Sequence, residues 1–211
     1  MSRIFLLSPA NCNGSRAKQI LSDRATFALA EELRSAAGAP LGDVFAFVSG
    51  LYFRGKLTYA RRFAAPPDDV NPIIASGIHV ITANSGLREA DTRITEHAFR
   101  AFGGADIDLD NPGYRRPLEQ SAKRLADEIG DDCDVVLLGS IASAKYVGAL
   151  LEIFGSRLRF PREFVGRGDM SRGGLLLRMA DAGQELEYVP VDGAIRHGQR
   201  PPKLPPLQRA R

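Results

Sequence analysis

Residues 134–155 read DVVLLGSIASAKYVGALLEIFG, and this stretch decides the predicted fold. The apolar run from Val135 to Leu138 stops at Gly139, and beyond a small polar segment the apolar residues return with helical spacing. The pattern predicts a buried strand, a tight loop and a helix that Gly155 ends. In open α/β sheets such a loop lies at the carboxyl end of its strand, where ligands bind.

Similar units occur along the whole chain. Apolar runs bounded by turn-forming residues predict further strands at Ile4–Leu7, Val44–Val48, Gly77–Thr82, Leu158–Phe160 and Leu186–Val191. Helical spacing predicts an interrupted helix over 15–37 and further helices over 51–64, 96–102, 114–129 and 174–182, the last capped by Ser171. Four parallel strands alternating with helices predict an α/β fold, a three-layer α/β/α sandwich with a mostly parallel central sheet.

Length and composition suit one soluble domain. The chain has 211 residues, of which 44% are hydrophobic and 25% charged. We expect one α/β domain over 1–192 and a basic, proline-rich tail over 193–211. Residues 155–211 carry 11 Lys or Arg against 6 Asp or Glu, so this last quarter is the basic part. Arg outnumbers Lys by 23 to 5, which suits bidentate contact with phosphate or carboxylate. A GC-rich genome, which favours Arg codons throughout, is the simpler explanation.

The N-terminal apolar run is too short for a signal peptide or a membrane span, so we expect a cytoplasmic protein with no membrane partner. Cys12 follows the first predicted strand and Cys133 precedes a parallel one, at opposite ends of the sheet. Because that separation exceeds the reach of a disulfide, both are expected to be free thiols.

The first candidate site is the loop SPANCNGSRA after the first strand. Gly14 and Ser15 before Arg16 could present backbone amides and a positive charge to an anion. A tight turn with solvated polar residues is the alternative. Cys12 is also a candidate nucleophile at a helix start, but no His follows another strand end to serve as its base.

Two later loops carry further candidates. Lys145 at the start of a helix is unfavourable against the helix dipole unless an anion is bound there, although an exposed Lys in a first turn is common. The glycine-rich segment 164–174 contains Asp169, the best general-base candidate because flanking arginines keep it ionised. The alternative is that Asp169 or Ser171 is a helix cap. His79, inside a strand, is interpreted as a buried core histidine, and no His or Cys pair has metal-binding spacing.

Three stretches, IFLLSPANCNGSRA, VITANSGLREADTRI and VVLLGSIASAKYVGAL, carry a resemblance. They resemble a group of bacterial Rossmann-like α/β proteins, distantly similar to the uracil-DNA-glycosylase-like domains of deazaguanine-modifying enzymes. The residues that carry the likeness are Ala83, Gly86, Leu87, Asp91, Thr92, Gly139, Lys145, Tyr146 and Val147. Asn84 stands in place of the usual lysine or histidine, and the acid-bearing loop of true glycosylases is missing from SPANCNG. The resemblance therefore implies the fold and not base excision.

These observations predict a polar, cationic pocket at the carboxyl ends of the strands. The expected substrate-binding residues are Asn11, Cys12, Asn13, Ser15, Arg16, Asn84, Ser85, Ser140, Ser143, Arg167 and Arg172, with Asp169 and Lys145 as the catalytic candidates. The mixture suits a nucleotide or phosphosugar, and a hydrolase or glycosyl transferase would use Asp169 to activate water against an N-glycosidic or phosphate bond. No cofactor or metal is expected.

Two other function classes stay open. The basic C-terminal quarter could bind nucleic acid, or the protein could be a small-molecule sensor without turnover; homo-oligomerisation is also left open. Scarce aromatic residues for base stacking, with no Trp in the chain, count against nucleic acid.

Overall fold

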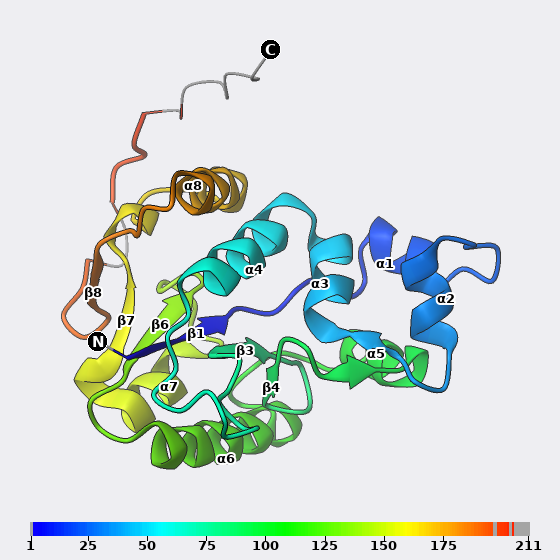
Figure 1. Cartoon of the computed structure of the whole chain (residues 1–211), viewed down its shortest axis with the longest axis horizontal. Helices are drawn as coiled ribbons and strands as arrows, with labels where there is room; N and C mark the ends of the chain where they lie inside the picture. The colour runs from blue at the N-terminus through cyan, green and yellow to red at the C-terminus, as the bar shows by residue number, and fades with distance from the viewer. Residues whose placement is uncertain (1, 196–197, 203, 205–211) are drawn as a thin grey trace.

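The computed structural model describes residues 2–195, 198–202 and 204. Its centre is a six-stranded sheet in the order β4-β3-β1-β6-β7-β8 (Figure 1). The strands are β1 (Arg3–Leu7), β3 (Ile78–Ile81), β4 (Leu87–Glu89), β6 (Asp134–Leu138), β7 (Leu158–Pro161) and β8 (Tyr188–Pro190). The inner four are parallel, and β4 and β8 pair antiparallel at the two edges.

The sheet is built around β1 and β6. Ile4 pairs with Val135 and Leu7 with Leu138, and these side chains are completely buried. Continuous apolar runs are typical of parallel strands, which are covered on both faces. The stretch chosen from the sequence is therefore the central part of the fold.

Helices cover the sheet on both sides. The helices are α1 (Ser15–Ile20), α2 (Ala28–Arg34), α3 (Leu41–Ser49), α4 (Leu51–Phe63), α5 (Glu96–Gly103), α6 (Pro112–Ile129), α7 (Val147–Phe154) and α8 (Asp169–Ala182), with short 3-10 turns at Gly155–Arg157 and Arg162–Phe164. In Figure 1, α4 and α8 lie above the sheet and α6 and α7 below it. This mixed α/β arrangement is compatible with the expected sandwich.

Helices α4 and α8 pack unusually closely through two glycines. A Cβ atom on Gly55 would lie 2.6 Å from the carbonyl oxygen of Gly173, and a Cβ on Gly173 would lie 2.7 Å from the carbonyl oxygen of Leu51. Helix α8 begins after β7, and α4 runs back toward the start of β3. Gly173, in the first turns of α8, contacts Leu51, the first residue of α4. The N-termini of the two helices therefore lie side by side.

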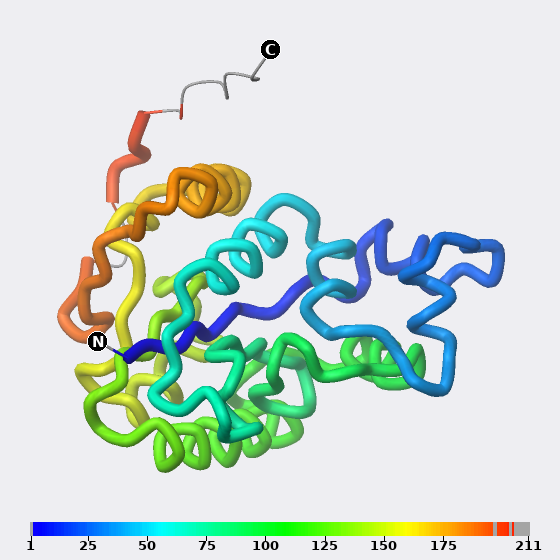
Figure 2. Tube along the Cα trace, in the orientation of Figure 1, coloured from blue at the N-terminus to red at the C-terminus, as the bar shows by residue number. Residues whose placement is uncertain are grey.

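A second group of elements lies beyond the carboxyl end of β1. Figure 2 shows the chain leaving β1 toward α1 and α2, and α5 lying beneath them. A two-stranded sheet of β2 (Ala39–Pro40) and β5 (Arg93–Ile94) joins this group. These elements therefore lie next to the carboxyl edge of the sheet, where ligands are expected.

The predicted strand at Val44–Val48 is wrong, because these residues belong to helix α3. Leu41, Val44, Phe45 and Val48 are buried, and their spacing of three and four residues is helical. A short apolar run rich in Val and Phe is also typical of a strand. The run alone therefore could not distinguish a strand from a helix. The fourth parallel strand is instead β7, from Leu158.

Two boundaries near the C-terminus also differ from the prediction. Helix α8 begins at Asp169 and not at Gly174, and its N-cap is Gly168 without a side-chain cap, so Ser171 is not the cap. The last strand is shorter than expected, Tyr188–Pro190.

The two cysteines are free thiols, as predicted. Within the described residues, no helix is both long and apolar enough to cross a membrane. The tail residues 196–197, 203 and 205–211, with the basic residues Arg196, Lys203, Arg209 and Arg211, lie outside the described residues.

Candidate functional site

The loops that follow the four parallel strands lie at one edge of the sheet, because the strands share one direction. From β1 the chain passes to β3 on one side, and from β6 it passes to β7 on the other. The order therefore reverses between β1 and β6. In open α/β sheets a crevice forms at such a switch point, outside the carboxyl ends of the strands.

The ends of β1 and β6 approach each other closely at this point. A Cβ on Gly139 would lie 2.9 Å from the Cβ of Ser8 and 2.9 Å from the hydroxyl oxygen of Tyr146. The backbone N–H of Ser8 donates to the carbonyl oxygen of Leu138 at 3.2 Å. Glycine is needed at 139 because a larger residue would displace Ser8 or Tyr146.

Lys56 of α4 reaches the end of β1 and is 1% exposed. Its Nζ lies 2.6 Å from the carbonyl oxygen of Ser8 and 2.9 Å from the Ser8 Oγ. It also lies 4.6 Å from the ring centre of Tyr52 and 4.5 Å from that of Phe53. Within the described residues no carboxylate reaches ion-pair distance of Lys56. Burial lowers the pKa of Lys56 to about 7, and the more distant carboxylate of Asp169 partly opposes this lowering.

Three buried tyrosines belong to the same region. The Tyr146 hydroxyl accepts a hydrogen bond from the Ser140 N–H at 3.1 Å and is 3.2 Å from the Ser140 carbonyl oxygen. Burial raises the pKa of Tyr146, and hydrogen bonding with Ser140, Ser143 and Ser8 opposes that rise. The hydroxyls of Tyr52 and Tyr114 are buried and have no hydrogen-bond partner in the described part of the chain. We call Ser8, Lys56, Tyr52, Tyr114 and Tyr146 the β1–β6 cluster.

Two adjoining hollows open beside the N-termini of α4 and α8. The first, of about 360 Å³, is lined by Asn11, Gly14, Ser15, Arg16, Val48, Ser49, Gly50, Leu51, Arg54 and Met170. The second, of about 420 Å³, is lined by Leu51, Arg167, Gly168, Met170, Ser171, Gly174, Leu177, Arg178, Arg200, Pro201, Pro202 and Leu204. They share Leu51 and Met170, and we call them together the arginine hollows. Within the described residues, five arginines and no Asp or Glu line them.

The first arginine hollow is closed on one side by Arg16. Its Nη1 donates to the carbonyl oxygen of Phe47 at 3.3 Å, and a Cβ on Gly50 would lie 2.5 Å from this nitrogen. Gly50 also has a φ of +64°, which favours glycine. Arg54 lies on the exposed side of α4, and among the described residues it has neither an ion pair nor a hydrogen bond through its side chain. Its guanidinium is available to a ligand.

The residues predicted in the first loop divide between two roles. Ser15, Arg16 and Asn11 line the first arginine hollow. Asn13 holds the loop to α5, because its Nδ2 donates to the Gly103 carbonyl oxygen at 2.8 Å. Burial raises the pKa of Cys12 to about 12, so its thiol stays protonated at neutral pH, contrary to the lowered pKa that a nucleophile at a helix start requires.

The residues predicted near Asp169 lie beside the second arginine hollow. Arg167 lines it and lies 3.2 Å from the Ser171 Oγ. The Arg172 guanidinium is mostly buried, stacks 5.3 Å from the Phe164 ring centre and donates to the Phe164 carbonyl oxygen. The Asp169 side chain is 68% exposed and pairs with Arg172 at 3.5 Å. Asp169 and Arg172 therefore belong to the first turns of α8 and not to a loop.

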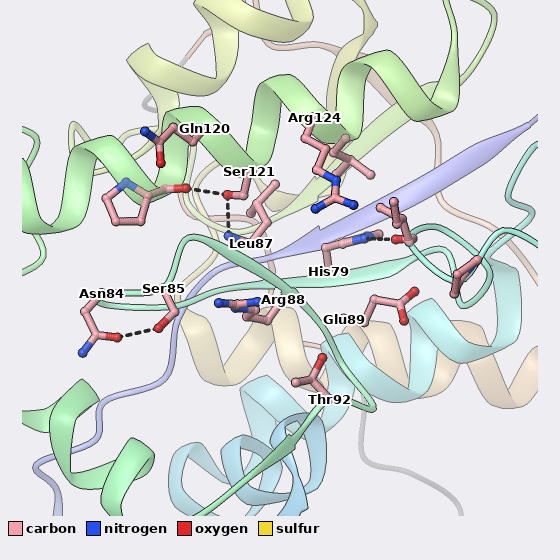
Figure 3. A pocket seen from close by; sticks show the side chains of 14 residues that line it. His79, Asn84, Ser85, Leu87, Arg88, Glu89, Thr92, Gln120, Ser121 and Arg124 are labelled. Atoms are coloured by element: carbon pink, nitrogen blue, oxygen red, sulfur yellow. Dashed lines mark hydrogen bonds between the residues drawn. The ribbon is translucent and has the colours of Figure 1, made fainter.

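The remaining predicted residues are more scattered. Ser140 belongs to the crevice through its contacts with Tyr146, whereas the Lys145 side chain is exposed on the loop before α7. Asn84 and Ser85 line a separate hollow of about 620 Å³ between β4 and α6 (Figure 3). The Ser85 hydroxyl donates to Asn84 Oδ1 at 2.8 Å. The loops after β1, β3 and β7 thus line three different hollows, of which those of the β1 and β7 loops adjoin.

His79 lines this third hollow and is 4% exposed. Its Nε2 lies 2.9 Å from the Ile73 carbonyl oxygen, while its Nδ1 has no partner in the described part of the chain. Burial lowers the pKa of His79, so the neutral ring is favoured. No group of three or more His, Cys, Asp or Glu that could hold a metal ion occurs in the described ranges.

Sequence reasoning missed Ser8, Lys56, Tyr52, Tyr114 and Arg54. A signal for Lys56 was present, because it stands three residues after Phe53 and three before Tyr59, on the apolar side of its helix. A lysine at such a position is either buried or folded outward along its stem. Here the helix packs against β1 and α8, so Lys56 is buried.

No protein-family model matches this chain, and neither a curated protein nor a solved structure matches it.

Proposed function

We propose that this protein binds a small phosphate-bearing molecule, a nucleotide or a phosphosugar, in the arginine hollows, at the carboxyl edge of a three-layer α/β/α sandwich. The observation that supports it is that five arginines and no carboxylate from the described residues line these hollows. Guanidinium groups bind phosphate oxygens through paired N–H donors. An uncompensated cationic lining is unfavourable without an anion.

The two helices that begin there add to this attraction. Neither Gly50 before α4 nor Gly168 before α8 supplies a side-chain cap to the first N–H groups. The positive ends of both helix dipoles face the arginine hollows, because Leu51 and Met170 from the first turns line them. Backbone amides at a helix start are common phosphate ligands.

The proposal is tested by equilibrium binding of adenosine 5′-monophosphate, adenosine and ribose 5-phosphate to the full chain. We expect the two phosphates to bind and adenosine to bind more weakly or not at all. Arg54→Gln should weaken phosphate binding by roughly 10-fold or more, since a hydrogen bond to a charged group contributes about 1.5–3 kcal/mol. Arg116→Gln, on the exposed surface of α6, is the matched control.

Equal binding of adenosine and its monophosphate would contradict the proposal. So would unchanged affinity in Arg54→Gln and Arg16→Gln together, because these variants remove both arginines of the first hollow. Turnover at an N-glycosidic or phosphate bond, with Asp169 as the base, is a separate expectation. It is checked by looking for product with any ligand that binds, in the native chain and in Asp169→Asn.

Nucleic-acid binding is the second candidate, and the continuity of the arginine hollows favours it, since Arg200 extends the cationic lining into the C-terminal segment. If it holds, affinity for a single-stranded oligonucleotide should fall steeply with salt. Deleting residues 193–211 should abolish that binding and leave binding of the monophosphate in the first hollow intact. An oligonucleotide affinity that the deletion leaves unchanged would count against this candidate.

A further inference from the structure

We infer that Ser8 and Lys56 form a nucleophile and general-base pair that acts on the carbonyl group of a small ester or amide at the carboxyl ends of β1 and β6. The distance of 2.9 Å between Ser8 Oγ and Lys56 Nζ is the hydrogen-bond distance that such a pair requires. This inference does not rest on phosphate binding in the arginine hollows.

The surroundings of Lys56 favour the neutral amine that a base must be. The amine is desolvated, with Tyr52 and Phe53 beside it, and no carboxylate among the described residues reaches it. The neutral amine has two N–H groups and one lone pair. In the structure Lys56 Nζ donates to both the carbonyl oxygen and the Oγ of Ser8. In the neutral amine one N–H can keep the carbonyl contact, and the lone pair can accept the Ser8 hydroxyl proton.

The charged and titratable groups facing Lys56 come from each element packed on it. From α4 there is Tyr52, from the loop after β6 there is Tyr146, and from α8 there are Asp169 and Arg172. Asp169 raises the pKa of Lys56 and Arg172 lowers it, so the two oppose each other. Desolvation is the largest cause, and it leaves the pKa at about 7.

A second observation points to a ligand beside this pair. The hydroxyl groups of Tyr52 and Tyr114 are buried without a hydrogen-bond partner in the described residues, which costs free energy unless another group satisfies them. Burial raises the pKa of both hydroxyls; Arg172 lowers that of Tyr52, and Tyr146, whose hydroxyl lies beside Gly139 close to Ser8, raises both. Such unpartnered donors suit the oxygen of a bound carbonyl.

The step proceeds as an acyl transfer. Ser8 Oγ forms a bond to the carbonyl carbon while its proton moves to Lys56 Nζ. The bond from that carbon to the leaving group then breaks, and the leaving group takes the proton from Lys56. A water molecule then forms a bond to the acyl carbon while one of its protons moves to Lys56 Nζ. The bond from that carbon to Ser8 Oγ breaks, Ser8 Oγ takes the proton from Lys56, and the carboxylic acid leaves. Because only 7% of Ser8 is exposed, a small acyl group is the fitting electrophile.

The test uses the full chain with p-nitrophenyl acetate and with a small alkyl fluorophosphonate, read by intact mass and peptide mapping. We expect one adduct per chain, on Ser8, and none on Ser8→Ala. Lys56→Met should slow its formation by about 100-fold or more, the usual contribution of a general base. Ser156→Ala and Lys123→Met, at exposed positions, should leave the rate unchanged.

The pH dependence gives a second readout that needs no variant of Lys56. After subtraction of the Ser8→Ala background, the rate should rise with pH with a midpoint near 7, where the amine loses its proton. The absence of a Ser8 adduct on the folded protein overturns the inference. A rate that is flat between pH 5.5 and 9 also overturns it, and so does an adduct that forms equally fast in a folded Lys56→Met protein.

Discussion

The Lys56→Met protein should lose the rise in unfolding free energy that the native chain shows between about pH 7 and pH 10. Folding lowers the pKa of Lys56 from 10.5 to about 7. In this window the unfolded chain therefore holds a proton that the folded chain releases. Stability then increases with pH, by about 1.4 kcal/mol per unit for one group. Below pH 7 both states hold the proton, so this contribution is constant there.

The measurement is urea unfolding at pH 7, 8 and 9 on the native chain, Lys56→Met and the exposed control Lys123→Met. We expect the difference between the native chain and Lys56→Met to change by about 2 kcal/mol from pH 7 to pH 9. Lys123→Met should follow the native chain. Parallel pH profiles for all three proteins would mean that Lys56 keeps its proton in the folded state, and the base role of Lys56 would then fail with it.

Gly173→Ala should destabilise the protein by about 1–3 kcal/mol or more, and its neighbour Gly174→Ala should not. The added methyl group at 173 would lie 2.7 Å from the Leu51 carbonyl oxygen and from the Tyr52 Cα. Since these are backbone atoms, the helices α4 and α8 must separate, which is the cost of overpacking. At 174 the nearest atom, Leu204 Cδ1, is 3.8 Å away, an ordinary contact.

Gly174→Ala should even stabilise the chain by about 0.5–1 kcal/mol, because alanine favours the helix over glycine. The two variants are compared by chemical unfolding under the same conditions. Equal effects at 173 and 174 would contradict the close contact of α4 with α8. Gly173→Ala should also slow acylation of Ser8, because the same contact sets the position of Tyr52 and Lys56 on α4.

Much of the central architecture could be predicted from local pattern. The strands around Ile4 and Val135 and the amphipathic helices α4 and α6 follow from apolar spacing, which persists whatever packs against them. Because these strands are parallel, the loops that follow them must lie at the same edge of the sheet. The strand prediction at Val44–Val48 was wrong because these five residues suit a strand and a helix equally well. Only the burial of both Leu41 and Val48 in the structure distinguishes the helix from the strand.

The sequence by itself therefore determined the α/β class, the carboxyl edge and the polar loops placed there, because each depends on residues close together in the chain. Only the tertiary structure decided which side chains meet at that edge. Ser8 and Lys56 are 48 positions apart, and the lysine loses its water only when α4 packs on β1 under α8. Gly173 and Gly174 look alike in sequence, yet a Cβ at 173 would contact backbone and one at 174 would contact only the end of the Leu204 side chain. Such contacts depend on how distant segments pack, and local pattern does not contain them.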